Sequence, residues 1–254
     1  MQLFYKQYSC AGEPLIILHG LFGNQGNWAM HAKKLSEQFS IYGFDARNHG
    51  RSGWAETMSY QEMAEDLIET MDALGLSSAH FIAHSMGGKT AMQLAMLAPD
   101  RIKKMILVDI APVEYPAGPY AVLEGLESLD LSTLTSRSQA DLLLQKYVEE
   151  KGVRDFLLTN LQKDKQGAYS WRLNLSALVN CYSEIKAGLS PEGVYPQEVL
   201  FIKGADSDYI LAEHREAILR QFPATKIKII ENAGHWVHSE KPSAFIKIVE
   251  GYLS

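Results

Sequence analysis

The chain has little of what marks several protein classes. Only two of its 254 residues are cysteines, Cys10 and Cys181, so we expect two free thiols and no disulfide framework. Apolar runs are all shorter than the ~20 residues that cross a bilayer, and the first residues lack a signal-peptide pattern. We therefore expect a cytoplasmic protein with no membrane span. The net charge of −6 leaves no basic excess for a phosphate backbone, which excludes nucleic acid as a main partner.

Short apolar segments and helical patterns alternate up to residue 111 and again from residue 197. Six segments have strand character: 14–18, 40–44, 79–83, 105–109, 199–203 and 227–230. Several are apolar throughout, as parallel strands buried on both faces are. The clearest helix covers 59–74, where Ser59 and Glu62 form a capping box and Gly75 follows the last turn. This order predicts an α/β fold with a mostly parallel, doubly wound sheet that binds ligands at the carboxyl ends of its strands.

The alternation stops between residues 112 and 196. No convincing strand is expected there, and leucine-rich helical patterns cover 140–149 and 173–185. A length of 254 residues suits one α/β domain with an insertion better than two separate domains. We therefore predict a core formed by 1–111 and 197–254, and a helical cap over 112–196 that supplies much of the pocket wall.

The segment Ala83-His84-Ser85-Met86-Gly87 joins a predicted strand to a helical pattern over 89–97. A serine at such a corner is typical of a nucleophile elbow, whose tight turn demands small residues two positions away. Gly87 meets that demand, and Ala83 is one methyl larger than the glycine usual on the strand side. A serine that only caps the helix is the alternative. We expect Ser85 to be a nucleophile.

A serine hydroxyl needs a base within hydrogen-bond reach, and the base needs a third group to orient it. His235 lies in the segment 232–238, directly after the last predicted strand, where the loop can direct it back over the sheet. His238 competes for this role, and two histidines three residues apart are only a weak metal signal. His49 belongs to the loop 45–52, whose side chains are typical of a loop that bonds to itself. We expect His235 to be the base and no metal to be bound.

Three aspartates are candidates for the group that orients the histidine. In this kind of site the acid falls between the serine and the histidine along the chain. Asp109 ends the predicted strand 105–109, and Asp206 and Asp208 follow the strand 199–203. Each loop can approach the histidine, so spacing alone leaves the choice open.

Attack on a carbonyl creates an oxyanion that needs preorganised donors, usually two backbone N–H groups. Met86, the residue after the predicted nucleophile, supplies one. The loop Gly20-Leu21-Phe-Gly23 follows the first central strand, and its glycines let the backbone bend so that Leu21 supplies the other. A phosphate-binding loop would need a Lys-Ser/Thr pair or the dinucleotide glycine pattern, and neither is present. We expect no cofactor.

Together these segments resemble the α/β-hydrolase family. The matching motifs cover most of the chain outside the cap: His19-Gly-Leu-Phe-Gly, Asp45-Ala-Arg-Asn-His-Gly, His84-Ser-Met-Gly-Gly-Lys89, Val108-Asp-Ile-Ala-Pro-Val113 and Asn232-Ala-Gly-His-Trp-Val-His238. The resemblance implies an α/β-hydrolase fold with Ser85 as nucleophile and His235 as base. In the subgroup that the chain is similar to, the acid is taken from the end of the sixth strand, which favours Asp109. This sequence departs from the subgroup by placing Asp206 and Asp208 in the later loop.

The resemblance also implies a cofactor-free esterase or thioesterase acting on a small carboxylic ester or an acyl-CoA thioester. Two alternatives stay open. One is a carbon–carbon bond hydrolase, lyase or perhydrolase with the same triad, and the other is a ligand-binding relative without turnover. Fold and triad do not separate these functions, because the cap and pocket decide the substrate. Both a monomer and a homodimer are compatible with the sequence.

Overall fold

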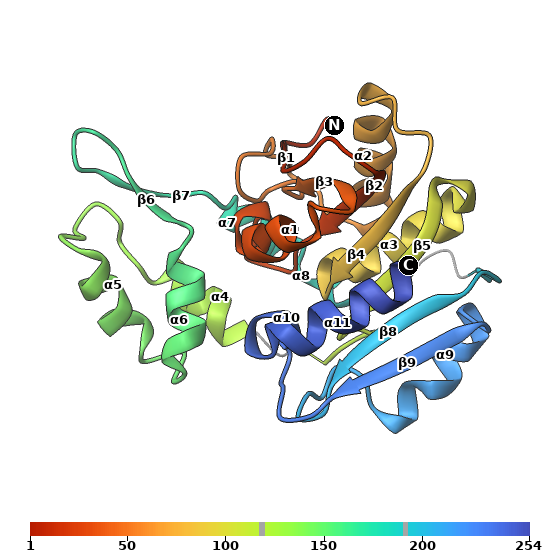
Figure 1. Ribbon diagram of the computed structural model, residues 1–254. Coiled ribbons are helices and arrows are strands. Elements are labelled where there is room, and N and C mark those ends of the chain that lie inside the picture. Colours follow the sequence, from red (N-terminus) through yellow and green to blue (C-terminus); the bar gives the residue numbers. More distant parts are fainter. Residues whose placement is uncertain (117–119, 190–192) are drawn as a thin grey trace.

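The computed structural model describes residues 1–116, 120–189 and 193–254 (Figure 1). At its centre is a seven-stranded sheet with the strand order β1-β3-β2-β4-β5-β8-β9. The strands are β1 (Tyr5–Gln7), β2 (Glu13–Leu18), β3 (Phe39–Phe44), β4 (Ala79–His84), β5 (Ile102–Val108), β8 (Val199–Gly204) and β9 (Thr225–Ile230). Only β1 runs antiparallel to its neighbour. The six predicted strands and the doubly wound parallel sheet are thus confirmed.

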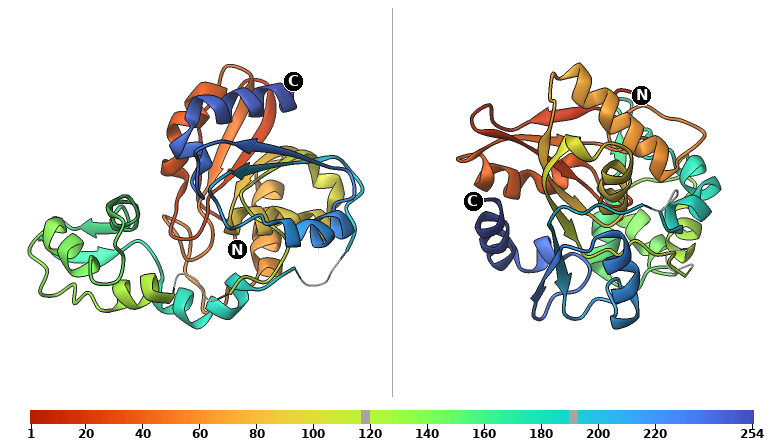
Figure 2. Two further views of the ribbon diagram at one scale, coloured as in Figure 1. Left: turned by 90° about the horizontal axis from the view of Figure 1, so that it is seen from below. Right: turned by 90° about the vertical axis from the view of Figure 1, so that its right-hand side faces the viewer.

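Helices cover both faces of the sheet (Figure 2). One layer contains α2 (Tyr60–Ala73), α3 (Met86–Leu97) and α9 (Arg215–Gln221), and the other contains α1 (Ala29–Leu35) and α11 (Pro242–Leu253). Side chains of β2 alternate between the layers: Ile16 and Leu18 pack toward α2 and α3, whereas Leu15 and Ile17 pack toward α1 and α11. Burial on both faces is why this strand is apolar throughout. The shorter helical elements are η1 (Gln25–Trp28), η2 (Pro99–Arg101), η3 (Ala212–His214) and α10 (Val237–Glu240).

The start of α2 confirms the predicted capping box. The Ser59 hydroxyl accepts a hydrogen bond from the Glu62 amide, and the Glu62 carboxylate accepts one from the Ser59 amide at 2.8 Å. These two bonds satisfy N–H groups that the first turn of a helix leaves without partners. At the other end, Gly75 takes a φ of +69°, a backbone conformation that glycine adopts at little cost.

Residues 112–196, the predicted cap, contain α4 (Tyr120–Glu127), α5 (Arg137–Leu144), α6 (Lys151–Leu158), α7 (Leu175–Asn180) and α8 (Tyr182–Lys186). In Figures 1 and 2, α4, α5 and α6 project away from the sheet. The helix expected at 140–149 begins earlier, because Ser136 caps α5. The helix expected at 173–185 is two helices that meet at Cys181. Residues 117–119 and 190–192 of the predicted cap lie outside the described residues.

The expectation of no strand between 112 and 196 was wrong. An antiparallel hairpin pairs β6 (Leu161–Lys163) with β7 (Tyr169–Trp171). Its turn is held by Asp164, whose carboxylate accepts hydrogen bonds from the amides of Gln166 and Ala168 at 2.9 and 2.8 Å, while Gly167 takes a φ of +95°. Strands of three residues are too short to produce a recognisable alternation, which is why the sequence pattern missed them.

The expectations on disulfides and membrane spans concern the described part of the chain. Both cysteines are free thiols, with Cys10 exposed and Cys181 buried. Within residues 1–116, 120–189 and 193–254, no helix combines the length and the apolar character needed to cross a membrane.

Candidate active site

Ser85 lies at the corner between β4 and α3 with a φ of +53° and a ψ of −119°. A residue with a side chain rarely takes this conformation, and the packing around it must maintain the strain. A Cβ added to Gly87 would lie 2.6 Å from the carbonyl oxygen of His19 and 2.8 Å from Cβ of Leu18. The end of β2 therefore passes so close to the corner that only glycine fits at position 87. The methyl group of Ala83 is accommodated in the sheet, where it is fully buried.

Three side chains from separate loops meet at the carboxyl edge of the sheet. Ser85 Oγ lies 3.0 Å from His235 Nε2, and His235 Nδ1 lies 2.8 Å from Asp109 Oδ2. Asp109 directly follows β5, and His235 lies between β9 and α10. Because parallel strands end at the same edge, residues 150 positions apart come into contact there.

The Asp109 carboxylate is fully buried and accepts three hydrogen bonds. In addition to the contact with His235, the Gly204 amide donates to Oδ1 at 3.0 Å and the Ser207 hydroxyl donates to Oδ2. The Asp109 backbone has a φ of +52°, and its own amide donates to the Ile202 carbonyl at 2.8 Å. These bonds hold the carboxylate in a single orientation, with one oxygen directed at the imidazole.

The two other candidate acids occupy the loop after β8 but do not reach the imidazole. Asp206 and Asp208 are exposed, and neither contacts His235 in the described structure. The loop contributes instead through two residues that the sequence did not single out. Ser207 bonds the acid, and the ring of Tyr209 stacks on His235 with 3.6 Å between ring centroids and 17° between planes. Neither residue has a spacing signal, because an ordinary loop also contains serine and tyrosine.

The remaining histidines near His235 form a buried, neutral group. The His84 ring donates from Nε2 to the His235 carbonyl at 2.9 Å. This bond fixes the backbone at the candidate base. His238 stacks on Trp28 with 4.1 Å between ring centroids, and burial lowers its pKa to about 3. In the described ranges, no three or more His, Cys, Asp and Glu side chains are grouped so that they could hold a metal ion.

The loop 19–23 passes close over the serine. A Cβ added to Gly20 would lie 3.1 Å from Cβ of Ser85, so glycine allows the close approach. The Phe22 amide donates to His49 Nε2 at 3.1 Å, and burial lowers the pKa of His49 to about 3, so that this ring stays neutral and accepts. Through His49, the loop 45–52 therefore contacts the loop 19–23 directly. The Leu21 amide has no acceptor among the described residues.

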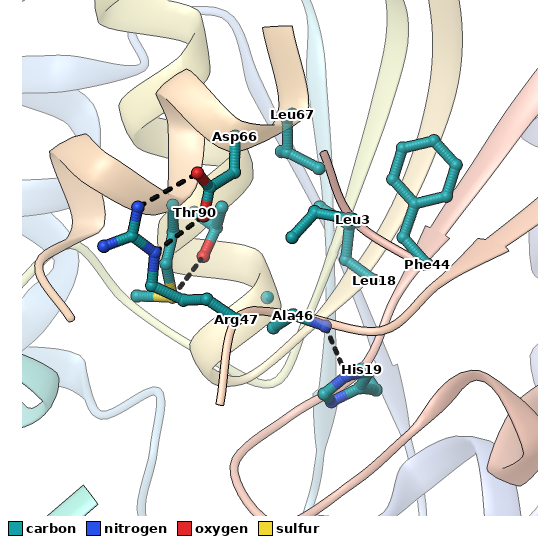
Figure 3. Close-up of a pocket in the computed structure, with 11 residues that line it drawn as sticks. Leu3, Leu18, His19, Phe44, Ala46, Arg47, Asp66, Leu67 and Thr90 are labelled. Carbon is teal, nitrogen blue, oxygen red and sulfur yellow. Dashed lines mark hydrogen bonds and ion pairs between the residues drawn. The ribbon is translucent and has the colours of Figure 1, made fainter. Parts of the chain in front are cut away.

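Figure 3 shows how the loop is supported from below. The guanidinium of Arg47 makes a two-point contact with the buried carboxylate of Asp66 at 2.6 and 2.9 Å, and the Ala46 amide donates to His19 Nε2 at 3.0 Å. The void between these groups has a volume of about 20 Å³, which is room for roughly one water molecule. The void is therefore too small for a substrate, and the contacts around it serve to support the loop.

Two larger cavities flank the serine, and both are lined by Leu21, Ser85 and Tyr209. The smaller cavity, about 230 Å³, also includes His235 and has a mostly apolar wall formed by Phe22, Val122, Val153, Phe156, Leu157 and Trp236. The larger cavity, about 510 Å³, continues along Met86 and Ile110. Its wall includes aromatic and charged side chains, among them one of the two rejected acids, Asp208: Tyr60, Lys89, Tyr115, Tyr182, Lys186, Asp208, Glu213 and His214. A substrate carbonyl at Ser85 would thus have space on both sides.

Comparisons with known proteins agree with this architecture. Residues 13–242 match the model of the alpha/beta hydrolase fold family. The chain is 37% identical to Esterase YbfF of Escherichia coli, over 95% of this chain and 93% of that protein. It is 38% identical to the sn-1-specific diacylglycerol lipase ABHD11 of Mus musculus, over 94% of this chain and 80% of that protein. A solved structure described as a marine microorganism esterase superposes with a TM-score of 0.95 at 38% identity, and 98% of each chain is covered. The chain therefore belongs to the α/β-hydrolase family, and its esterase and lipase relatives support a hydrolase activity.

Proposed function

We propose that the protein hydrolyses carboxylic esters through an acyl-enzyme on Ser85, with acyl-CoA thioesters as a second candidate substrate class. One observation carries the proposal: an unbroken set of contacts runs from Ser85 Oγ to His235 at 3.0 Å and from His235 to Asp109 at 2.8 Å. These residues would supply a nucleophile, a base and a group that orients the base.

The reaction would proceed in two halves. Ser85 Oγ attacks the carbonyl carbon while His235 Nε2 takes the hydroxyl proton. The tetrahedral intermediate then collapses, the bond to the alcohol or thiol breaks, and His235 returns the proton to the leaving atom. A water molecule next gives a proton to His235 and attacks the acyl-enzyme, which releases the carboxylic acid and restores Ser85. Asp109 holds the imidazole with its proton on Nδ1 throughout.

The Leu21 and Met86 amides would stabilise the negative oxygen of the intermediate. Met86 is the first residue of α3, so its N–H has no partner within the helix, and the Leu21 N–H has no acceptor in the described structure. Both residues line the wall beside Ser85. Preorganised donors of this kind contribute about 10²- to 10³-fold to kcat each.

The position of His235 suggests how a substrate would lie. The imidazole lines the smaller cavity but not the larger one. Because His235 must deliver a proton to the leaving atom, we place the alcohol or thiol in the smaller cavity and the acyl chain in the larger cavity along Met86. The mostly apolar smaller cavity suits an apolar alcohol.

Labelling by a fluorophosphonate tests the proposal directly. We expect one adduct on Ser85, and turnover of p-nitrophenyl esters that falls by about 10⁵- to 10⁶-fold in Ser85→Ala. Ser77→Ala is the matched control, because Ser77 is exposed and lies before β4, at the opposite end of that strand from Ser85. Wild-type labelling elsewhere, or full ester turnover by Ser85→Ala, would overturn the assignment. Acyl-CoA thioesters and diketones assayed in parallel separate ester and thioester hydrolysis from carbon–carbon bond cleavage.

A further inference from the structure

Two segments of the predicted cap lie side by side, 113–115 near its start and 185–187 in and after α8, and we call them the junction. They are joined by a hydrogen bond from the Tyr115 amide to the Lys186 carbonyl at 2.9 Å. An ion pair between Lys186 and Glu114 at 2.7 Å also links them, but its exposed partners make it a weak contact. The junction therefore depends on other contacts to hold its position against the core.

Some of these contacts come from the Tyr115 hydroxyl, which accepts from the Ala111 amide at 2.8 Å and donates to the Tyr209 carbonyl at 2.6 Å. A buried cation supplies the others. Lys89 lies one helical turn after Ser85, and its amide donates to the Ser85 carbonyl at 3.1 Å. Its side chain is almost fully buried, and Nζ donates to the carbonyls of Val113 at 2.7 Å, Ala187 at 2.5 Å and Lys186 at 3.2 Å. All three N–H bonds of the ammonium group are thus directed at the junction, with acceptors on both of its segments.

Two tyrosine rings complete the surroundings of this cation. Nζ of Lys89 lies 4.7 Å from the centroid of the Tyr115 ring and 5.4 Å from that of Tyr60. Both distances are within the range of a cation–π attraction. The Tyr60 hydroxyl donates to the Ile185 carbonyl at 2.5 Å, so this ring also connects α2 with the junction.

Burying an ammonium group away from water costs free energy. Burial lowers the pKa of Lys89 to about 7, which reflects the cost of removing the charge from water. An apolar side chain of the same volume would pack there without that cost. Packing alone therefore does not account for a lysine at this position. Its hydrogen bonds to three carbonyl groups of the junction do account for it.

We propose that Lys89 is a positioning residue that determines substrate specificity. It fastens the junction to the helix of Ser85 and so fixes the wall of the larger cavity. Tyr60, Tyr115, Ile185 and Lys186 line that cavity together with Lys89, whereas Asp109 and His235 do not. A displaced junction would therefore reshape the space for the acyl chain. The hydrogen bonds that join Ser85, His235 and Asp109 involve no junction residue, and Tyr115 reaches the triad only through the carbonyl of Tyr209, whose ring stacks on His235. This inference rests on the proposed function only in assigning the acyl chain to the larger cavity.

Lys89→Met tests the proposal, because methionine keeps a long side chain and removes every donor. Gln93→Met is the matched control: Gln93 lies one turn further along α3, is fully buried, and its amide has no partner in the described structure. We expect the ratio of kcat/KM for p-nitrophenyl decanoate to kcat/KM for p-nitrophenyl acetate to fall about tenfold in Lys89→Met, mainly through KM, since a bond to a charged group is lost. The ratio in Gln93→Met should stay at the wild-type value.

Hydrogen exchange provides a readout that needs no turnover. The Tyr115 amide should exchange at least about tenfold faster in Lys89→Met and at the wild-type rate in Gln93→Met. Tyr60→Phe, which removes only the hydroxyl bonded to Ile185, should shift exchange and selectivity in the same direction and serves if Lys89→Met does not fold. Wild-type exchange in a folded Lys89→Met, or faster exchange with unchanged chain-length selectivity, would overturn the proposal. A wild-type protein that hydrolyses no ester would instead refute the proposed function, and the exchange measurement would still test the fastening.

Discussion

Replacing Asp109 by asparagine should lower kcat by about 10⁴-fold while the protein stays folded. The carboxylate accepts from three donors: the Gly204 amide at Oδ1, and both the His235 ring and the Ser207 hydroxyl at Oδ2. An asparagine side chain has one oxygen and one NH₂ group, so one of these donors must face another donor.

The surroundings decide which arrangement results. The Gly204 amide is part of the backbone of β8 and cannot turn, so the asparagine oxygen should stay there and the NH₂ group should take the place of Oδ2. The Ser207 hydroxyl can rotate and accept. His235 can accept at Nδ1 only by moving its proton to Nε2, and that nitrogen then no longer accepts the proton of Ser85. The whole loss therefore appears in kcat, and 10⁴-fold equals roughly 5 kcal/mol of transition-state stabilisation.

The assay is steady-state hydrolysis of a p-nitrophenyl ester by Asp109→Asn, with thermal unfolding to show that the variant is folded. Asp206→Asn is the control, because Asp206 is exposed and makes no contact with the imidazole. Its turnover should stay within about twofold of the wild type, as is usual for surface positions. If Asp109→Asn kept more than a tenth of wild-type kcat, or if Asp206→Asn lost as much, the role argued for Asp109 would be refuted.

Three further predictions follow from the same contacts. Ser207→Ala removes one charge-assisted hydrogen bond to the buried acid and should lower kcat about tenfold in the same assay, with little change in KM. Gly87→Ala should lower the free energy of unfolding by about 1 to 3 kcal/mol and slow fluorophosphonate labelling, because its Cβ would lie 2.6 Å from the carbonyl oxygen of His19. Gly251→Ala, with open space around it, should be neutral or stabilising in denaturant unfolding. Below pH 6.5 the free energy of unfolding should decrease, because burial lowers the pKa of His19 to about 4 and of His49 to about 3, and the unfolded chain then binds protons that the fold excludes. The shift at His19 alone corresponds to roughly 2.5 kcal/mol by pH 4.5, and denaturant unfolding between pH 7.5 and 4.5 measures this decrease.

Each of these has an outcome that would contradict it. Wild-type kcat in Ser207→Ala would mean that the hydroxyl does not hold the acid. Equal stability of Gly87→Ala and Gly251→Ala would show that the corner has room for a methyl group. A free energy of unfolding that stays constant from pH 7.5 to 4.5 would mean that the buried histidines are already protonated in the fold or accessible to water.

Local pattern was enough to predict the framework of this protein. Strands buried on both faces are apolar throughout, and the capping box of α2 is a contact within four residues, so both features can be recognised without the rest of the fold. The same holds for the corner at Ser85, whose tight turn restricts its immediate neighbours. The hairpin of β6 and β7 was missed because its strands are only three residues long.

Contacts between distant loops could not be predicted in this way. Spacing left Asp109, Asp206 and Asp208 equally open, and only the folded sheet shows that Asp109 contacts the imidazole whereas the other two do not. Lys89 belongs to a motif that carries the family resemblance, but nothing in the local pattern indicates its burial, since a lysine on a helix is usually exposed and its acceptors lie 24 to 98 residues away. Side-chain identity and local periodicity determined the strands, the helices and the candidate nucleophile, base and acids. Which of them meet was decided by the tertiary structure, because the packing of separate strands and loops sets the direction of each side chain.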